Sequence, residues 1–266
     1  MKWSGQPMRT TGVFSSRPFS SSSTALPKPR GSTWSSSVRI TSTVLVHRGR
    51  LYLMGVACEY GRVVIRESRD GGLTWSPPSY LTSDPNFHTA PVPMAIHDGR
   101  IWRAMEYHPP GPWGFFQALL LSAPVKANLL DPRSWRFSDR LPYPASAAEG
   151  QHWLKGNAAV ARDGALVDIL RVDNVKKAAL VRLNGDRLEF VRLIAFPGGA
   201  KKFTIRYDPK SHRYWALVNP APQSPVPASV HNTLALASSM DLLEWRIDRI
   251  LLTHPDPLKH AFQYVD

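Results

Sequence analysis

Short apolar runs separated by turns follow one another along most of the chain. Many of these runs alternate apolar and polar residues, which is the pattern of a strand with one buried face. No segment keeps apolar residues at positions i, i+3, i+4 and i+7 over three helical turns, so the pattern excludes a helical bundle. The sequence therefore predicts an all-β protein built from short antiparallel strands.

One hairpin recurs four times, with an apolar strand before each turn and another after it. Its turns lie at residues 47–52, 97–102, 162–167 and 210–215, and the strand before the second turn is expected over residues 90–96. Four strands in about 55 residues, repeated along a chain, are typical of β-propeller blades. The predicted units span residues 38–85, 86–145, 149–197 and 199–254, and a fifth begins at residue 259.

An eight-residue turn, Ser-Arg-Asp-Gly-Gly-Leu-Thr-Trp, closes a hairpin of the first unit at residues 68–75. In such a turn an Asp carboxylate accepts hydrogen bonds from turn amides, and a Gly takes a positive φ. The stretch resembles the Asp-box of bacterial neuraminidase repeats, which are found in sialidases and related β-propellers. Every position of the motif is filled, by Ser68, Asp70, Gly72 and Trp75. The resemblance implies a sialidase-like β-propeller of four-stranded blades, in which this structural turn faces away from the active site.

Sialidase propellers have six blades, whereas this chain supplies about four full units and the start of a fifth. Residues 31–34 repeat the second half of the Asp-box upstream of the first unit. We therefore expect residues 38–266 to be a propeller truncated at both ends. Residues 1–37 are expected to be a disordered or remnant segment, because their composition cannot bury enough apolar surface to become ordered.

The formal net charge of +13 comes largely from the first 50 residues, since no Asp or Glu precedes Glu59. The remaining body lacks clustered Lys and Arg interleaved with aromatics, so we expect no nucleic-acid partner. No apolar run is long enough for a membrane span, and no signal-peptide core is visible, which leaves the compartment open between cytoplasmic and secreted. The single Cys58 and the scattered histidines predict neither a metal site nor a cofactor.

In a propeller the innermost strand of each blade lines a central channel, and the second strand returns to the same rim. Residues just before the innermost strands and just after the second strands should therefore meet there. Glycoside hydrolysis needs two carboxyl groups, one protonated and one ionised, on either side of the bond to be cleaved. Among the polar residues at these positions, the catalytic candidates are Glu106 and Asp173, with Glu59 in reserve.

An acidic sugar also needs a cationic clamp, because its carboxylate pairs best with the planar fork of arginine. The substrate-binding candidates share the predicted rim and are His88, Arg103, Asn157, Arg171, Lys202, Asn232 and Gln263. A structural role is the alternative for the charged members, for example a salt bridge from Arg171 to Asp173 or Glu106.

The resemblance implies an exo-acting sialidase-like hydrolase whose partner is a glycan or glycoconjugate with a terminal, acidic sugar. Sialidases use three arginines, a tyrosine–glutamate nucleophile pair and an aspartate acid/base, drawn partly from the first and last blades. That aspartate, the first arginine and the nucleophilic tyrosine cannot be placed on residues of this chain, so the fragment could be inactive. Two alternatives stay open: a non-catalytic carbohydrate-binding propeller, and a propeller glycosidase for neutral sugars.

Overall fold

The computed structural model describes residues 42–147, 149–220, 230–257 and 261–262. Within these ranges the chain forms four antiparallel sheets, one from each predicted unit. The segment 1–37 and the partial Asp-box near residue 34 lie outside the described residues. So does the predicted fifth strand from residue 259, apart from residues 261 and 262, which are not assigned to a strand. The prediction of six blades in the complete fold therefore stays a prediction.

The strands of the four sheets are as follows. The first sheet contains β1 (Ser42–His47), β2 (Arg50–Val56), β3 (Val63–Ser68) and β4 (Ser79–Tyr80). The second contains β5 (Phe87–His88), β6 (Ala95–His97), β7 (Arg100–Tyr107), β8 (Gln117–Pro124), β9 (Arg136–Phe137) and β10 (Leu141–Pro142), with the 3-10 helix η1 (Pro132–Ser134). The third contains β11 (Trp153–Val160), β12 (Leu166–Val172), β13 (Lys177–Asn184) and β14 (Arg187–Ala195). The fourth contains β15 (Thr204–Asp208), β16 (Arg213–Val218), β17 (Thr233–Ser239) and β18 (Trp245–Thr253).

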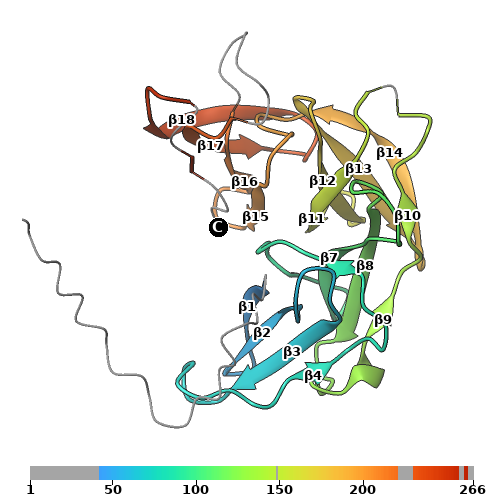
Figure 1. Cartoon of the computed structure of the whole chain (residues 1–266). Helices are drawn as coiled ribbons and strands as arrows, with labels where there is room; N and C mark the ends of the chain where they lie inside the picture. The colour runs from blue at the N-terminus through green and yellow to red at the C-terminus, as the bar shows by residue number, and fades with distance from the viewer. Residues whose placement is uncertain (1–41, 148, 221–229, 258–260, 263–266) are drawn as a thin grey trace, which may run out of the picture. The chain divides into compact units, whose positions relative to one another are not determined.

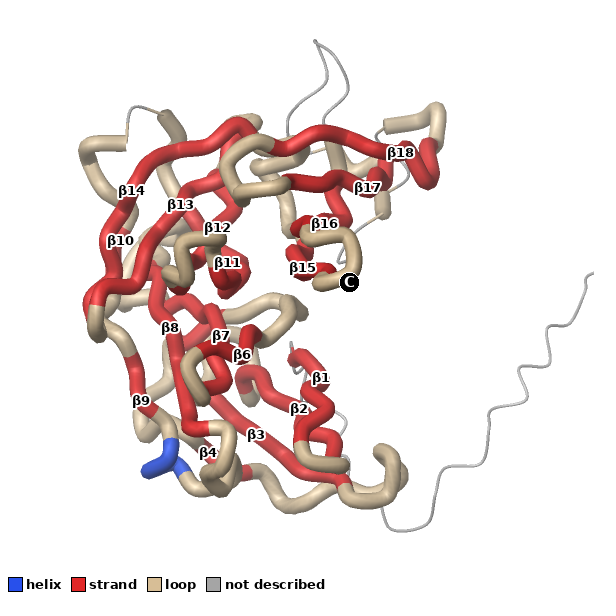
Figure 2. The backbone as a smooth tube through the Cα atoms, turned by 180° about the vertical axis from the view of Figure 1, so that it is seen from behind, coloured by secondary structure: helices blue, strands red, loops and turns tan. Residues whose placement is uncertain are grey.

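The four sheets are blades of a β-propeller that follow one another around a common centre (Figure 1). Strands β1, β6, β11 and β15 lie nearest that centre, as the view from behind also shows (Figure 2). Each sheet is ordered from its innermost strand outwards because consecutive strands pair through tight antiparallel hairpins. This arrangement brings the innermost strands of successive blades side by side, and β11 contacts both β7 and β15.

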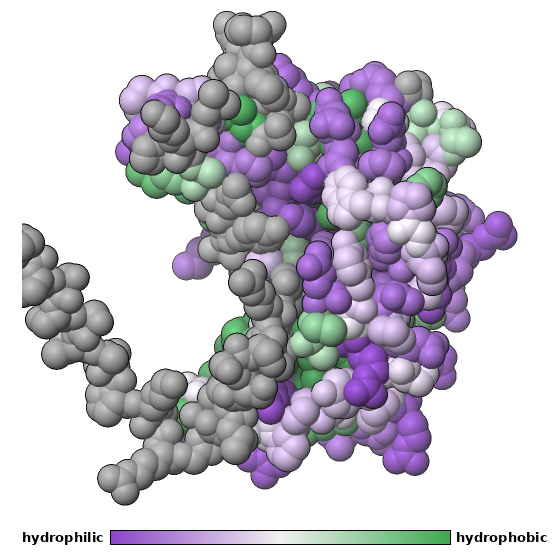
Figure 3. All heavy atoms as spheres, viewed as in Figure 1, coloured by the Kyte–Doolittle hydropathy of each residue, from purple (hydrophilic) through white to green (hydrophobic). Residues whose placement is uncertain are grey.

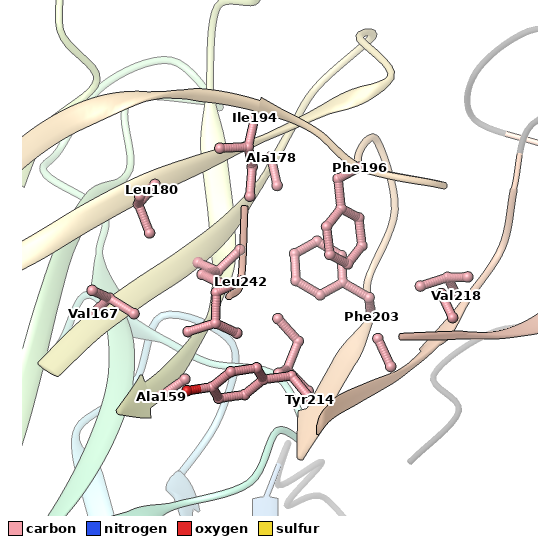
Figure 4. Packing of buried hydrophobic residues seen from close by; sticks show 14 of the residues in the cluster. Ala159, Val167, Ala178, Leu180, Ile194, Phe196, Phe203, Tyr214, Val218 and Leu242 are labelled. Carbon is pink, nitrogen blue, oxygen red and sulfur yellow. The ribbon is translucent and has the colours of Figure 1, made fainter. Parts of the chain in front are cut away.

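Apolar side chains fill the spaces between successive blades. In the third blade, Val167 and Ile169 pack towards the fourth blade with Tyr214 and Phe203, as Figure 4 shows for three of them. The next residue, Leu170, packs towards the second blade instead. The described part of the face drawn in Figure 3 is mostly hydrophilic, with separate small apolar spots. Burial of each large aliphatic side chain contributes about 1.5–3 kcal/mol, so these interfaces hold the blades together.

The second blade departs from the expected four strands, because it has six. Its innermost strand is divided into β5 and β6, and the strand expected over residues 90–96 forms only at its end. Pro91 and Pro93 fall in the gap, and proline has no N–H to donate to a sheet. The guanidinium of Arg103 donates to the carbonyls of Val92 and Ala90, so a side chain replaces the missing strand contacts.

The turn at residues 68–75 closes on itself as its sequence predicts. Asp70 Oδ1 accepts hydrogen bonds from Ser68 Oγ at 2.8 Å and from the Thr74 N–H at 2.9 Å. Gly72 has a φ of +97°, and the Trp75 indole N–H donates to its carbonyl at 3.1 Å. The turn is a self-contained hydrogen-bonded unit, which explains why a local motif could predict it.

Candidate functional site

The starts of the innermost strands and the ends of the second strands form one edge of the propeller, here called the hub rim. The strand registers fix it, since His88 pairs with Glu106, Trp153 with Val172 and Thr204 with Leu217. Buried polar side chains gather near this edge, namely Glu106, Lys155, Asn157, Asp173, Lys201, Lys202, Asn219 and Asn232. The strand topology therefore brings these polar side chains to one edge, and their role as a site stays a prediction.

Glu106 links the second blade to the third. It lies near the end of β7 with 1% of its surface exposed. Its Oε1 accepts a hydrogen bond from the Gly156 N–H at 2.9 Å, and its Oε2 lies 2.9 Å from His88 Nδ1. The proton of this contact lies on His88 Nδ1 when Glu106 is ionised and on Oε2 when Glu106 is protonated. The side chain is thus held from both sides by partners on different blades.

Asp168, which the sequence analysis missed, is the second carboxyl group of this cluster. It lies in the middle of β12, is fully buried, and neither carboxyl oxygen has a hydrogen-bond partner by standard geometry. Burial, together with the charge of Glu106, raises the pKa of Asp168 well above its usual value, and the Asn157 amide and Arg103 only partly oppose this. Its sequence signal is an aspartate in the middle of the mainly apolar strand Leu166–Val172.

The backbone beside Asp168 is shaped to make room for it. A Cβ built on Gly156 would overlap the Asp168 carboxyl, so only glycine fits at that position. The preceding Lys155 has a φ of +62°, and the pairing of β11 with β12 shifts register between Leu154 and Asn157. A bulge of this kind turns backbone and side-chain groups towards a site, and here it aims the Gly156 N–H at Glu106.

The two arginines expected to clamp an acidic sugar make protein contacts instead. Arg103 is fully buried and donates to the Val92 carbonyl, to the Ala90 carbonyl at 2.7 Å and to Thr89 Oγ1 at 2.8 Å. Arg171 forms an ion pair with Asp173, which is the structural alternative considered for these residues. Their main visible role is therefore to hold the hub rim together.

Among the lysine and asparagine candidates, Asn157 connects the third and fourth blades, whereas Lys202 and Asn232 make contacts within the fourth. Asn157 accepts the Ile205 N–H at 3.0 Å, while Asn232 donates to the His254 carbonyl at 2.8 Å. Lys202 Nζ donates to Thr204 Oγ1 at 2.6 Å. Burial lowers the pKa of the neighbouring Lys201 to about 8, and its Nζ donates to the Asn219 carbonyl at 2.7 Å.

Aromatic side chains surround His88 at the same rim. The rings of Tyr60 and Phe116 lie 6.3 Å and 5.2 Å from the imidazole of His88. Trp113 packs edge-on against Phe116 and is 56% exposed. An exposed indole packed on the aromatic cluster around His88 offers a sugar ring an apolar surface on which to stack. By contrast, Trp153 is fully buried core.

Two of the predicted site residues remain, Glu59 and Gln263. Glu59 is exposed, and Gln263 lies outside the described residues.

A cavity of about 650 Å³ opens near the other ends of the innermost strands, where His97, Arg162 and Tyr207 line it. Within the described ranges, no group of three or more His, Cys, Asp or Glu side chains could hold a metal ion. No helix in those ranges has the length and apolarity to cross a membrane.

Comparison with solved structures places the chain among β-propellers. It is similar to a GH43 β-1,3-galactosidase solved with galactodeoxynojirimycin (TM-score 0.51, 14% identity, 78% of this chain and 75% of that chain). It is also similar to a family 117 glycoside hydrolase from Zobellia galactanivorans (TM-score 0.56, 10% identity, 82% and 71%). A Hadza microbial sialidase matches with a TM-score of 0.57 and 12% identity over 80% of this chain and 45% of that chain.

At these identities the likeness shows the fold alone. The chain spans less than half the length of the sialidase and 48% of an exo-β-1,3-galactanase from Clostridium thermocellum. No protein-family model matches the sequence, and no curated protein matches it.

Proposed function

We propose that this chain is an exo-acting glycoside hydrolase that cleaves a terminal sugar at the hub rim. The observation that carries the proposal is the burial of two carboxyl groups, Glu106 and Asp168, on neighbouring blades. They are close enough for the charge of Glu106 to raise the pKa of Asp168. The raised pKa keeps a proton on Asp168 at a pH where an isolated aspartate has lost it, so this cluster retains a proton that suits donation to a leaving oxygen.

Each carboxyl group takes a separate role in this proposal. Glu106 lies beside His88 at the rim and would donate the proton to the glycosidic oxygen. Asp168 lies under Gly156 and acts through Glu106 as a positioning residue. Asp173, paired with Arg171, is the carboxylate for the opposite side of the scissile bond. Glu59, exposed and outside this group, is not needed.

A neutral terminal sugar fits the site best. Recognition of a sugar carboxylate needs free arginine forks, whereas Arg103 donates to backbone carbonyls and Arg171 pairs with Asp173. The similar structures include a β-1,3-galactosidase, which supports a neutral substrate. A sialidase remains the second candidate, because the turn at residues 68–75 resembles the Asp-box of sialidases.

A glycoside panel tests the proposal. The protein is assayed with fluorogenic galactoside, arabinofuranoside and xyloside substrates and with a sialoside. We expect turnover of a neutral glycoside, reduced by about 10²–10⁴ in Glu106→Gln. Glu189→Gln, which changes an exposed carboxylate on β14 in the same way, should retain full activity.

The other outcomes separate the alternatives. Turnover of the sialoside alone would support the second candidate, a sialidase, and contradict a neutral substrate. Sugar binding without turnover, measured by calorimetry, would favour the carbohydrate-binding propeller. Unchanged turnover in Glu106→Gln would contradict the assigned role of the hub carboxyl groups.

A further inference from the structure

A second polar cavity lies between the first two blades, at the ends of their strands away from the hub rim. It has a volume of about 500 Å³ and is lined by the β1–β2 turn, the Asp-box side of β3 and the loop after β8. We call it the basic groove, and its charged residues are Arg48, Arg50, Glu67, Arg69 and Lys126. A cavity of this size accommodates a sugar-sized ligand.

The groove carries a surplus of positive charge. Four cationic side chains face one carboxylate, Glu67. That carboxylate is buried and already has three donors: Arg50 Nη1 at 2.8 Å, Arg69 Nε at 2.5 Å and the Tyr52 hydroxyl at 2.8 Å. Arg48 and Lys126 have no ion-pair partner within the described residues. The lining therefore lacks an anion of its own to balance these charges.

Three of the four cationic groups are also held in place. Glu67 orients the guanidinium groups of Arg50 and Arg69, whose side chains stay 42% and 72% exposed. Arg48 donates to the Lys126 carbonyl at 3.2 Å, which fastens the β1–β2 turn to the loop after β8. Donors fixed before binding lose less conformational entropy when an anion arrives, so the groove is organised for a charged ligand.

We propose that the basic groove binds the anionic group of a sulfated or phosphorylated sugar. Guanidinium forks match the oxygens of sulfate, phosphate and carboxylate groups, and the groove offers several within one cavity. A nucleic-acid strand would need a longer basic track with exposed aromatic residues for base stacking, and Tyr52, the aromatic residue of this lining, is buried.

This site is separate from the hub rim. The loop that carries Lys126 follows the end of β8 that pairs with Arg100, whereas Glu106 pairs with Ala118 near the other end. Six residues of strand span about 20 Å, so one monosaccharide cannot contact both sites. The proposal therefore holds or fails independently of hydrolysis at the hub.

Calorimetric titration tests it with four probes that share one ring: glucose 6-sulfate, glucose 6-phosphate, glucuronate and glucose. We expect glucose 6-sulfate or glucose 6-phosphate to bind, glucose not to bind, and the affinity to fall as salt is added. The double substitution Arg48→Ala and Lys126→Ala should weaken binding by about tenfold or more. Arg50 and Arg69 are left in place because they hold Glu67.

The matched control removes two exposed arginines from outer strands, Arg187→Ala and Arg249→Ala, and so lowers the net charge equally. Binding should be unchanged in this control and in Glu106→Gln. Equal weakening in both double variants would show a nonspecific effect of the high net charge and would overturn the site. Failure of both glucose 6-sulfate and glucose 6-phosphate to bind would overturn it as well, even if glucuronate binds. Selectivity between the two identifies the anion.

Discussion

Replacing Asp168 by asparagine should stabilise the fold at neutral and alkaline pH. The carboxyl group is fully buried, and its two oxygens have no hydrogen-bond partner. A buried polar group without a partner costs about 1–3 kcal/mol, and an ionised one costs more. Asparagine has nearly the same size and no charge, so we expect Asp168→Asn to raise the free energy of unfolding by about 1–3 kcal/mol at pH 8.5.

The pH dependence follows from the direction of the pKa shift. Because the pKa of Asp168 is higher in the folded state than in the unfolded chain, the folded state binds more protons over that interval. The stability of the natural chain therefore falls as the pH rises from about 4. The advantage of Asp168→Asn should be small at pH 4.5 and grow towards pH 8.5.

Urea unfolding followed by tryptophan fluorescence measures this difference at both pH values. The expected gain at pH 8.5 corresponds to roughly 3–9 °C in Tm for a domain of this size. Asp186→Asn, which changes an exposed carboxylate in a turn, should shift stability by less than about 0.5 kcal/mol. Destabilisation of Asp168→Asn at pH 8.5, or an equal gain at both pH values, would refute the reasoning.

Three further substitutions test the surroundings of the site and the first blade. Gly156→Ala should lower the free energy of unfolding by about 1–3 kcal/mol, because the added Cβ overlaps the Asp168 carboxyl, and urea unfolding would measure it. Burial opposes ionisation of Glu67, yet hydrogen bonds from Arg69, Arg50 and Tyr52 lower its pKa to about 2. Glu67→Gln should therefore reduce Tm at pH 7, and the deficit should shrink as the pH falls from 4.5 towards 2, since the carboxylate contributes stability only while ionised. Asp70→Ala should reduce Tm at pH 7, because it removes the side chain on which Ser68 and Thr74 close the turn. Hydrogen bonds lower the pKa of Asp70 to about 2, so thermal unfolding should show a smaller reduction at pH 2.5.

Local features of the fold could be predicted from the sequence because the contacts that make them are short in range. Each hairpin turn joins strands that are consecutive in the chain, so alternation and turn residues predicted the four units. The Asp-box turn was predicted for the same reason, since all its hydrogen bonds lie within residues 68–75. Blade topology then placed Glu106 and Asn157 near one rim.

The pairing of buried polar groups could not be predicted in the same way. The clamp role expected for Arg103 depended on the path of residues 89–94, where two prolines divide a strand and leave carbonyl groups for the guanidinium to bind. Asp168 lies in mid-strand, away from the strand ends where site residues were expected. Its relation to Glu106 exists only because two blades pack together.

The sequence by itself determined where the strands and turns lie, how the chain divides into blades, and which edge carries the unusual polar residues. Those features follow from hydrophobic alternation and turn chemistry within each unit. Only the tertiary structure decided that Glu106 meets Gly156, that Asp168 is buried without a well-formed hydrogen bond, and that Arg171 pairs with Asp173. Hydrogen bonds and charge interactions act over a few ångströms. Groups on different blades come that close only because the blades pack together, and the order of residues along the chain does not show which groups will meet.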